Sequence, residues 1–517
     1  MFDLEMAHPF QSHDDHFHEE CAVFGIWGVA HDEEDRSKAA TITATGLHSL
    51  QHRGQEACGI VAFDQGRFLV HRALGLVGDV FGQGKADDRR SGPLTRLVGT
   101  AAIGHTRYAT SGKGDGPTPV RNIQPLWTDL DDTGGFALAH NGNLTNAQTL
   151  KSDLRAEGRR FQSTVDTEVI LDLMARSREK RLASRLIDAL TRVVGAYSIV
   201  GLSAKKLIGV RDPSGVRPLV LGRLDNAWII CSETCALDIV GASFVRDIDP
   251  GEMVVIDENG LQSLRPFANA PRRFCIFEYI YFSRPDSFVE GNNVYAIRQQ
   301  IGRELALEET YKADMVIPIP DSGTPAAIGY AKESGIPFEL AITRSQLAGR
   351  SFIEPDQESR EQVVRRKLNV NRDMVRGKRV VLVDDSIVRG TTSKILVRMF
   401  RDAGVREVHM RIASPPTRSP CYYGVDTPSK GELIYNQYTS IEQMERHLGV
   451  DSLRYLSVKG MYRAAGETDI PENENDCGGK AGYCDACFTG VYPIDLIDAS
   501  GKSTSQTDLF REFSDQT

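Results

Sequence analysis

The chain has 517 residues, which is more than one hydrophobic core usually supports, so its length predicts two domains with additional segments. Its composition, 41% hydrophobic and 25% charged residues, excludes the disordered, collagen-like and coiled-coil classes. A net charge of −9 argues against a nucleic-acid binder, and the longest apolar runs fall far short of a membrane span, so we expect neither nucleic acid nor a membrane as a partner.

The amino-terminal residues 1–20 are polar and acidic, and no helix or strand period organises their histidines, so we expect a disordered leader. From residue 21 to about residue 264, short β-branched runs alternate with glycine-rich turns, which predicts a sheet-rich α+β domain. Apolar residues recur at helical spacing in residues 167–178 and 185–194, so helices are expected to pack on the sheet. The prolines of residues 266–271 mark a linker.

Beyond the linker, predicted helices and strands alternate. We expect helices over residues 295–307 and 324–334, and strands over residues 315–319 and 379–383. This alternation is typical of a parallel sheet flanked by helices. Residues after 463 are rich in glycine, asparagine and aspartate, and are expected to wrap over this domain. The predicted division is a leader (1–20), a first domain (21–268), a second domain (269–463) and a C-terminal segment (464–517).

The apolar run of residues 380–383 is followed by two carboxylates, Asp384 and Asp385, and then by the hydroxyl-rich residues 386–393, which lead into a pattern of helical spacing. A strand, loop and helix in this order point backbone N–H groups and the helix dipole at one spot, which suits a phosphate, and Gly390 allows close backbone approach. Adjacent carboxylates suit the paired hydroxyls of a ribose. Taken alone, such a loop is also compatible with residues that only cap the next helix.

Residues 381–392, Val-Leu-Val-Asp-Asp-Ser-Ile-Val-Arg-Gly-Thr-Thr, resemble the phosphoribosyl pyrophosphate motif of type I phosphoribosyltransferases. The resemblance implies an α/β domain with a parallel sheet, and a substrate that arrives with Mg²⁺. A second loop at residues 318–325 is a candidate for holding the pyrophosphate. By the resemblance, Mg²⁺ lies near Ser322, Asp384 and Asp385, and phosphoribosyl pyrophosphate is bound by Asp384, Asp385, Ser386, Arg389, Gly390, Thr391 and Thr392.

Cys21 stands where the polar leader turns into an apolar strand, a position that by itself also fits a buried packing cysteine. Three ordered strings downstream, residues 51–56, 104–110 and 139–144, together resemble class II glutamine amidotransferases, which are amino-terminal-nucleophile hydrolases. The resemblance implies an αββα sandwich and removal of residues 1–20, after which the α-amino group of Cys21 acts as the general base for its own thiol.

The same resemblance assigns the residues around that nucleophile. Preorganised donors stabilise a tetrahedral intermediate, and a guanidinium holds a carboxylate bidentately. The implied set is Asn141 and Gly142 as oxyanion donors, Arg107 for the α-carboxylate of glutamine, Asp166 for its α-ammonium, and Arg53 and His52 to close the site. For Arg107 and Asp166, a structural ion pair is the alternative interpretation.

A glutaminase followed by a phosphoribosyltransferase in one chain resembles the amidophosphoribosyltransferases, over about residues 21–496. That family converts glutamine, phosphoribosyl pyrophosphate and water into phosphoribosylamine, glutamate and pyrophosphate, the first step of purine synthesis. The resemblance further implies a shielded passage for ammonia, inhibition by purine nucleotides, and a homotetramer. Two alternatives stay open: another class II amidotransferase, and a catalytically silent protein that senses phosphoribosyl pyrophosphate.

The segment 343–366, which closes over the substrate in this family, is where the chain departs most from its relatives. These commonly have Asn-Arg-Tyr-Val-Gly-Arg-Thr-Phe, whereas residues 345–352 are Ser-Gln-Leu-Ala-Gly-Arg-Ser-Phe. The missing aromatic residue is expected to make closure or sealing of the passage less efficient. Arg350 remains a candidate contact for the pyrophosphate.

With nine cysteines and no signal-peptide pattern, we expect a cytoplasmic protein that uses cysteine for catalysis or metal binding instead of disulfides. The spacing of Cys484 and Cys487 alone suggests structural zinc, with free thiols as the other alternative. Cys275 and Cys421, however, match positions that ligate a 4Fe–4S cluster together with that pair in one branch of the family, which implies a structural, oxygen-sensitive cluster. The remaining assignments are Cys477 as a substitute ligand, and Cys58, Cys231 and Cys235 as packing residues.

Overall fold

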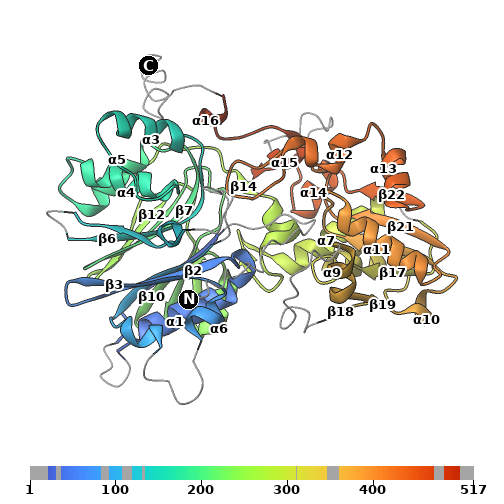
Figure 1. Ribbon diagram of the computed structural model, residues 1–517, viewed down its shortest axis with the longest axis horizontal. Coiled ribbons are helices and arrows are strands. Elements are labelled where there is room, and N and C mark those ends of the chain that lie inside the picture. Colours follow the sequence, from blue (N-terminus) through green and yellow to red (C-terminus); the bar gives the residue numbers. More distant parts are fainter. Residues whose placement is uncertain are drawn as a thin grey trace, which may run out of the picture.

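The computed structural model describes residues 21–30, 36–82, 92–107, 119–130, 134–309, 311–345, 360–470 and 482–500. The predicted leader, Arg350 and Cys477 lie outside these ranges. Figure 1 shows two bodies side by side: the sheets of the amino-terminal half, coloured blue to green, and the helix-flanked sheet of the carboxyl-terminal half, coloured yellow to red. Among the described residues, no helix combines the length and the apolar composition needed to cross a membrane.

The amino-terminal half is a sandwich of two antiparallel sheets. The strands of the first sheet are, in spatial order, β11 (Ser243–Asp247), β9 (Val220–Leu224), β10 (Ala227–Cys231), β1 (Cys21–Trp27), β4 (Ala101–Arg107), β2 (Ala57–Asp64) and β3 (Arg67–Leu74). Those of the second sheet are β13 (Gly260–Leu264), β12 (Met253–Asp257), β8 (Leu207–Arg211), β7 (Gly195–Ser203), β6 (Phe136–Leu144) and β5 (Leu126–Thr128). This arrangement confirms the predicted sheet-rich domain.

Helices cover both outer faces of the sandwich, which gives the predicted αββα layers (Figure 1). The helices on the first sheet are α1 (Lys38–Ser49) and α6 (Thr234–Val240), with the short α2 (Val77–Phe81) beside them, and those on the second are α3 (Ala147–Ala156), α4 (Thr167–Arg176) and α5 (Leu182–Leu190). Helix α5 begins and ends earlier than the predicted 185–194, because its buried stripe starts at Leu182 and ends at Leu190.

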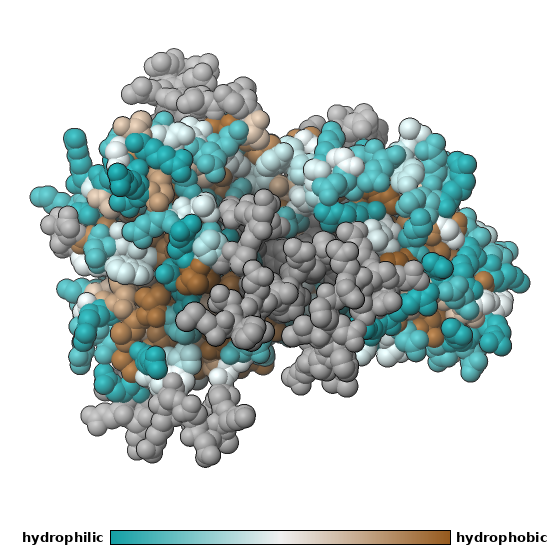
Figure 2. Space-filling view, viewed as in Figure 1, coloured by the Kyte–Doolittle hydropathy of each residue, from teal (hydrophilic) through white to brown (hydrophobic). Residues whose placement is uncertain are grey.

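Strand β1 is buried on both faces, because side chains alternate between two apolar layers. Val23 lies in the layer between the sheets, and Phe24 packs with α1 on the other face. At the edge of the same sheet, β3 is only partly buried. Figure 2 shows apolar side chains, in brown, gathered on the visible face of this half where β3 lies.

The carboxyl-terminal half is built on a parallel sheet, as predicted. Its strands, in spatial order, are β17 (Met315–Pro318), β20 (Arg379–Asp384), β21 (Glu407–Ile412) and β22 (Ser452–Tyr455). One face packs on α7 (Val294–Glu308), α8 (Thr324–Ser334) and α14 (Val458–Ala464), and the other on α9 (Arg360–Lys367), α11 (Thr391–Asp402) and α13 (Ile441–Leu448). Smaller elements are the strand pairs β15 (Phe288–Val289) with β16 (Asn292–Asn293) and β18 (Ile342–Arg344) with β19 (Leu368–Val370), and helices α10 (Arg372–Val375) and α12 (Ile434–Gln437).

The C-terminal segment contacts both halves of the molecule, although the sequence predicted that it would wrap over the second domain. Strand β23 (Tyr483–Cys484) pairs in parallel with β14 (Phe274–Cys275), and α15 (Ala486–Thr489) follows it. The chain then returns to the sandwich, where α16 (Ile497–Ser500) packs against α3. The backbone of this segment therefore links the second domain to the first.

A buried network of ion pairs joins the two halves. Arg53, which is 2% exposed, pairs with Glu233 of the first half and with Glu278 at 2.6 Å. Glu278 opens the π-helix Glu278–Phe282 at the start of the second half, and it also pairs with Arg217 at 3.1 Å. Burial alone would raise the pKa of Glu233 and of Glu278, but the neighbouring Arg53 holds the pKa of Glu233 well below its usual range and lowers that of Glu278. Both carboxylates are therefore charged inside the protein.

We expect Arg53→Met to lower the free energy of unfolding by about 3–5 kcal/mol, because it leaves two buried carboxylates without their shared partner. Arg265→Met is the matched control, since Arg265 pairs with Asp249 where the side chains are 60% and 52% exposed, and such surface pairs contribute about 1 kcal/mol at most. Urea unfolding of the full chain measures both variants. Equal losses of stability would contradict the structural role of the network.

Candidate active sites

The predicted nucleophile Cys21 is the first residue of β1, in the middle of the seven-stranded sheet. It is 8% exposed and lies directly opposite Arg107, the last residue of β4. The loop 51–56 packs on the same strand end: Glu56 donates its backbone N–H to the Arg107 carbonyl at 3.0 Å, and a Cβ at Gly54 would come within 2.7 Å of the Arg107 backbone nitrogen. Strand pairing thus brings two of the predicted strings to the cysteine.

The predicted oxyanion donors Asn141 and Gly142 lie on β6 of the facing sheet, which packs on β1. His105 of β4 links the two sheets here, with its Nε2 3.2 Å from the carbonyl oxygen of His140. Burial, together with the charge of Arg107, lowers the pKa of His105 to about 3, so its ring is neutral. The buried amide nitrogen of Asn141 has no hydrogen-bond partner within the described part of the chain, so it is available to an oxyanion.

Asp166, predicted to receive the α-ammonium, caps α4 and ties it to the end of β6. Its carboxylate accepts hydrogen bonds from the backbone nitrogen atoms of Leu144 and Thr167, both at 2.9 Å. Arg107 is connected through Asn122 to the segment that precedes Asp166. The Arg107 Nη1 donates to the Asn122 carbonyl at 2.9 Å. The Asn122 side-chain amide donates to the Thr164 hydroxyl at 2.7 Å and accepts from the Thr164 backbone nitrogen at 3.1 Å. Asn122 was not predicted from the sequence, because no motif marks it.

Arg53 and His52, predicted to close over glutamine, contact other protein groups. The guanidinium of Arg53 bonds to Glu233, Glu278 and Ser283, and the Nε2 of His52 lies 2.7 Å from Glu233. Their contact with glutamine stays a prediction. Glu233 and Glu278 were not predicted, since no local pattern relates residues that stand 180 and 225 positions from Arg53.

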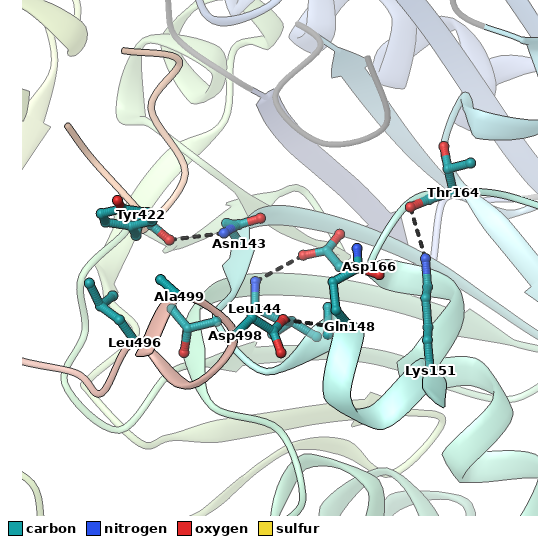
Figure 3. Close-up of a pocket in the computed structure, with 12 residues that line it drawn as sticks. Asn143, Leu144, Gln148, Lys151, Thr164, Asp166, Tyr422, Leu496, Asp498 and Ala499 are labelled. Atoms are coloured by element: carbon teal, nitrogen blue, oxygen red, sulfur yellow. Dashed lines mark hydrogen bonds between the residues drawn. The ribbon is translucent and has the colours of Figure 1, made fainter. Parts of the chain in front are cut away.

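A cavity of about 340 Å³ lies between Asp166 and the C-terminal segment. Figure 3 shows the Asp166 carboxylate directed at the backbone nitrogen of Leu144, and the Lys151 ammonium directed at the carbonyl of Thr164, 2.8 Å away. The lining residues are Asn143, Leu144, Thr145, Ala147, Gln148, Lys151, Thr164, Asp166, Tyr422, Leu496, Asp498 and Ala499. Cys21 is not among them, so the cavity adjoins the predicted glutamine site without containing its nucleophile.

The predicted phosphate loop follows β20 as a strand, loop and helix. Asp384 and Asp385 are 2% and 1% exposed at the carboxyl end of the strand. Ser322, from the loop after the neighbouring β17, donates its hydroxyl to Asp385 at 2.5 Å, and Ser386 donates to the other oxygen of that carboxylate at 2.8 Å. The structure therefore brings together the three side chains predicted for Mg²⁺, and hydroxyl and carboxylate oxygens are ligands that this ion prefers.

Helix α11 starts directly after Gly390, which has a φ of 80°. This backbone conformation favours glycine, and a Cβ here would also displace the Cδ1 of Ile434, which would lie 2.3 Å away. Thr391 begins the first turn, where backbone N–H groups have no partner within the helix and face a ligand readily. Arg389 pairs with Glu432 at 3.3 Å near the surface. Phosphate binding by this loop stays a prediction.

The four cysteines predicted to hold a cluster, Cys275, Cys421, Cys484 and Cys487, come together and are called the cysteine quartet below. Cys275 and Cys484 pair in register between β14 and β23. The carbonyl of Cys487 accepts hydrogen bonds from two backbone nitrogen atoms of the loop 418–421, which leads to Cys421. Burial, and after it the neighbouring quartet thiols, raise the pKa of Cys484 well above its usual value. Cationic metal would relieve this mutual repulsion of thiolates.

Within the described ranges, no three or more His, Cys, Asp or Glu side chains are arranged around a point that one metal ion could occupy. Structural zinc, a 4Fe–4S cluster and free thiols all stay predictions for the quartet. Cys58, Cys231 and Cys235 lie in the core beneath α1 and α6, and burial raises the pKa of Cys58 to about 12, so their role as packing residues is confirmed.

Comparisons with known proteins identify the family. The sequence matches a glutamine amidotransferase domain over residues 117–238 and a phosphoribosyl transferase domain over residues 292–424. It is 49% identical over 511 residues to an amidophosphoribosyltransferase of Rhizobium etli, covering 97% of this chain and 98% of that one, and 46% identical to one of Bacillus subtilis, covering 92% and 95%. The chain belongs to the amidophosphoribosyltransferase family.

Solved structures of this family have the same architecture. The glutamine phosphoribosylpyrophosphate amidotransferase from B. subtilis, complexed with ADP and GMP, aligns with a TM-score of 0.81 at 44% identity, over 92% of this chain and 98% of that one. A structure described as the allosteric regulatory enzyme of purine biosynthesis aligns with a TM-score of 0.82, also at 44% identity, over 92% and 97%. The two-domain fold predicted from the sequence is thereby confirmed.

We expect Gly142→Ala to slow glutamine hydrolysis by about 100-fold, the loss that follows when an oxyanion donor is displaced. Gly142 has a φ of 142°, and a Cβ there would lie 2.1 Å from the carbonyl oxygen of Ala196 on β7, so the strand must shift. Gly92→Ala is the control, because nothing lies within 4 Å of a Cβ at that position. Glutamate release measures both, and similar rates in the two variants would contradict the expected role of Gly142.

Proposed function

We propose that this chain is an amidophosphoribosyltransferase. It hydrolyses glutamine at Cys21 and transfers the ammonia to phosphoribosyl pyrophosphate, giving 5-phosphoribosylamine, glutamate and pyrophosphate, the first step of purine synthesis. Two features of one chain carry the proposal. Cys21 stands on a strand that packs against the strand of Asn141, which supplies an available buried amide donor. Asp384 and Asp385 are two buried carboxylates at the predicted phosphate loop. Identity of 49% over 97% of the chain supports the proposal.

At the glutaminase site, removal of the leader frees the α-amino group of Cys21, which takes the thiol proton. The thiolate attacks the side-chain amide carbon of glutamine, and Asn141 and Gly142 donate hydrogen bonds to the oxygen that becomes negative. The nitrogen takes the proton and leaves as ammonia, and water hydrolyses the remaining thioester to glutamate. Arg107 and Asp166 hold the α-carboxylate and the α-ammonium throughout.

At the transferase site, Asp384 and Asp385 accept hydrogen bonds from the ribose hydroxyls, and the loop 386–392 holds the 5′-phosphate at the start of α11. Together with Ser322, these carboxylates would hold Mg²⁺, which neutralises charge on the departing pyrophosphate. As the bond from the anomeric carbon to pyrophosphate breaks, positive charge builds on that carbon. The lone pair of ammonia adds there, and a proton leaves the nitrogen.

The proposal includes finer properties of the family. The cysteine quartet would hold a structural 4Fe–4S cluster, which supplies a cross-link between the C-terminal segment and the second domain. Ammonia would pass between the sites shielded from water, where it keeps its lone pair. A cytoplasmic homotetramer, inhibited by purine nucleotides, completes the proposal. The complex of the B. subtilis relative with ADP and GMP supports the nucleotide inhibition.

Cys21→Ala is expected to lower glutamine-dependent pyrophosphate release at least about 1,000-fold, because removal of a nucleophile removes the covalent route. With ammonium chloride as the nitrogen source, the same variant should keep its activity. Asp385→Asn is the complementary variant, and it should lose activity with both nitrogen sources. Pyrophosphate release measures each case. An unmodified chain that turns over with neither source would be a silent sensor, and the proposed function would fail.

Protein purified without oxygen is expected to carry about four iron and four sulfide per chain, the content of one 4Fe–4S cluster. Cys484→Ser should lose both, since one of four ligands is replaced. Cys58→Ser is the control, because Cys58 packs in the core of the first domain. Elemental analysis and sulfide assay decide the outcome: zinc without sulfide, or no metal at all, argues against the cluster.

A further inference from the structure

Helix α3 begins directly after the oxyanion strand β6, and a residue from the other end of the chain caps it. Asn146, in the cap position, uses its side chain to bond to the backbone of residues 192–194. In its place, the carboxylate of Asp498 accepts hydrogen bonds from the backbone nitrogen of Gln148 at 2.7 Å (Figure 3) and from that of Thr149 at 2.9 Å. These are the second and third residues of the helix, which a cap normally satisfies.

The same segment holds the end of β6. The hydroxyl of Thr145 donates to the carbonyl of Asp495 at 2.6 Å, and the backbone nitrogen of Asp498 donates to the carbonyl of Thr145 at 2.8 Å. Asn143 donates its side-chain amide to the carbonyl of Tyr422 at 2.9 Å. Residues 494–499, called the C-terminal clamp here, thus fix the chain within a few residues of the oxyanion donors.

The clamp contacts the segment that connects the predicted oxyanion donors to Asp166. Leu144 stands between the clamped residues, and its backbone nitrogen donates to the Asp166 carboxylate at 2.9 Å. Asn141 and Gly142 precede it on the same strand. A shift of residues 143–145 would therefore change the distance between the oxyanion donors and the group predicted to bind the α-ammonium.

At its other end the clamp is tied to the cysteine quartet. The hydroxyl of Tyr423, two residues after Cys421, accepts a hydrogen bond from the backbone nitrogen of Ile494 at 3.0 Å and donates to the carbonyl of the same residue. Tyr492 donates its hydroxyl to the carbonyl of Pro420 at 2.6 Å. The clamp is therefore tied at Ile494 to a residue close to Cys421, and at Asp498 to the start of α3.

We propose that Asp498 is a positioning residue for glutamine hydrolysis, through which the C-terminal clamp sets the oxyanion strand. This inference rests on the proposed glutaminase function. An anionic side chain suits the amino terminus of α3, where the helix dipole is positive. Since the clamp is anchored at the quartet, an ordered quartet keeps Asp498 in place, and the glutamine site is complete only when the last part of the chain is docked.

The decisive variants are Asp498→Ala and Asp498→Asn, with Asp495→Ala as the matched control, because Asp495 contributes its backbone carbonyl to Thr145 and keeps it as alanine. Displacement by a fraction of an ångström to one ångström costs up to roughly 100-fold, so we expect Asp498→Ala to lower kcat/KM for glutamine by about 10- to 100-fold. Ammonium-dependent synthesis should stay unchanged. Asp498→Asn, which keeps one of the two accepting oxygens, should recover part of the loss, and Asp495→Ala should match the unmodified protein.

Hydrogen exchange without substrates gives a second readout. In Asp498→Ala, the amides of residues 147–156 and 141–145 should exchange faster, while those of β20 and α11 should not change. Equal loss of glutamine-dependent and ammonium-dependent activity would reduce Asp498 to a general structural residue and overturn the inference, and so would unchanged kinetics. If the unmodified protein hydrolyses no glutamine, the proposed function fails, whereas the inference fails alone when that protein is active and Asp498→Ala is indistinguishable from it.

Discussion

Buried ion pairs join the two domains, and the arrangement of the domains depends on these pairs. The guanidinium of Arg53 is buried between Glu233 of the sandwich and Glu278 of the π-helix. Each of these ions would cost several kcal/mol if it stayed buried without its partners. These ion pairs therefore oppose separation of the two halves at this boundary. The loop 51–56 carries Arg53 and also packs on Arg107, so one loop connects the predicted glutamine site with the start of the second domain.

The sandwich and the parallel sheet position their predicted site residues in different ways. In the sandwich, strand register sets Cys21 opposite Arg107, and the facing sheet supplies Asn141 from a second layer. Two layers are needed because a nucleophile and an oxyanion donor must approach one carbonyl from different sides. In the parallel sheet, all strands end at one edge, so Asp385 and Ser322 meet there although they come from different loops. Regular backbone hydrogen bonds fix the reacting groups in both cases.

Local patterns in the sequence were sufficient to predict the parallel sheet, helix α4 and the loop after β20, because periodicity and turn chemistry are short-range properties. The quartet and Cys21 could be named only because whole strings resemble known families. Contacts that depend on chain folding could not be predicted: Glu278 meets Arg53 across 225 positions, and Asp498 caps α3 across 350. The side chain that caps helix α3 belongs to Asp498, which lies far from the helix in the sequence, and no local pattern indicates this residue.

The parallel pairing of β14 with β23 has a consequence for biosynthesis. Cys275 is among the first residues of the second domain to leave the ribosome, and its neighbour Cys484 is among the last, whereas every strand of the sandwich is complete by Leu264. Domains fold as units during translation, amino-terminal ones first. The sandwich is therefore formed while its helix α3 still lacks Asp498. Translation must proceed past Asp498 before the first domain acquires all its contacts, so a nascent chain that stops short of it would carry a folded but incomplete predicted glutamine site.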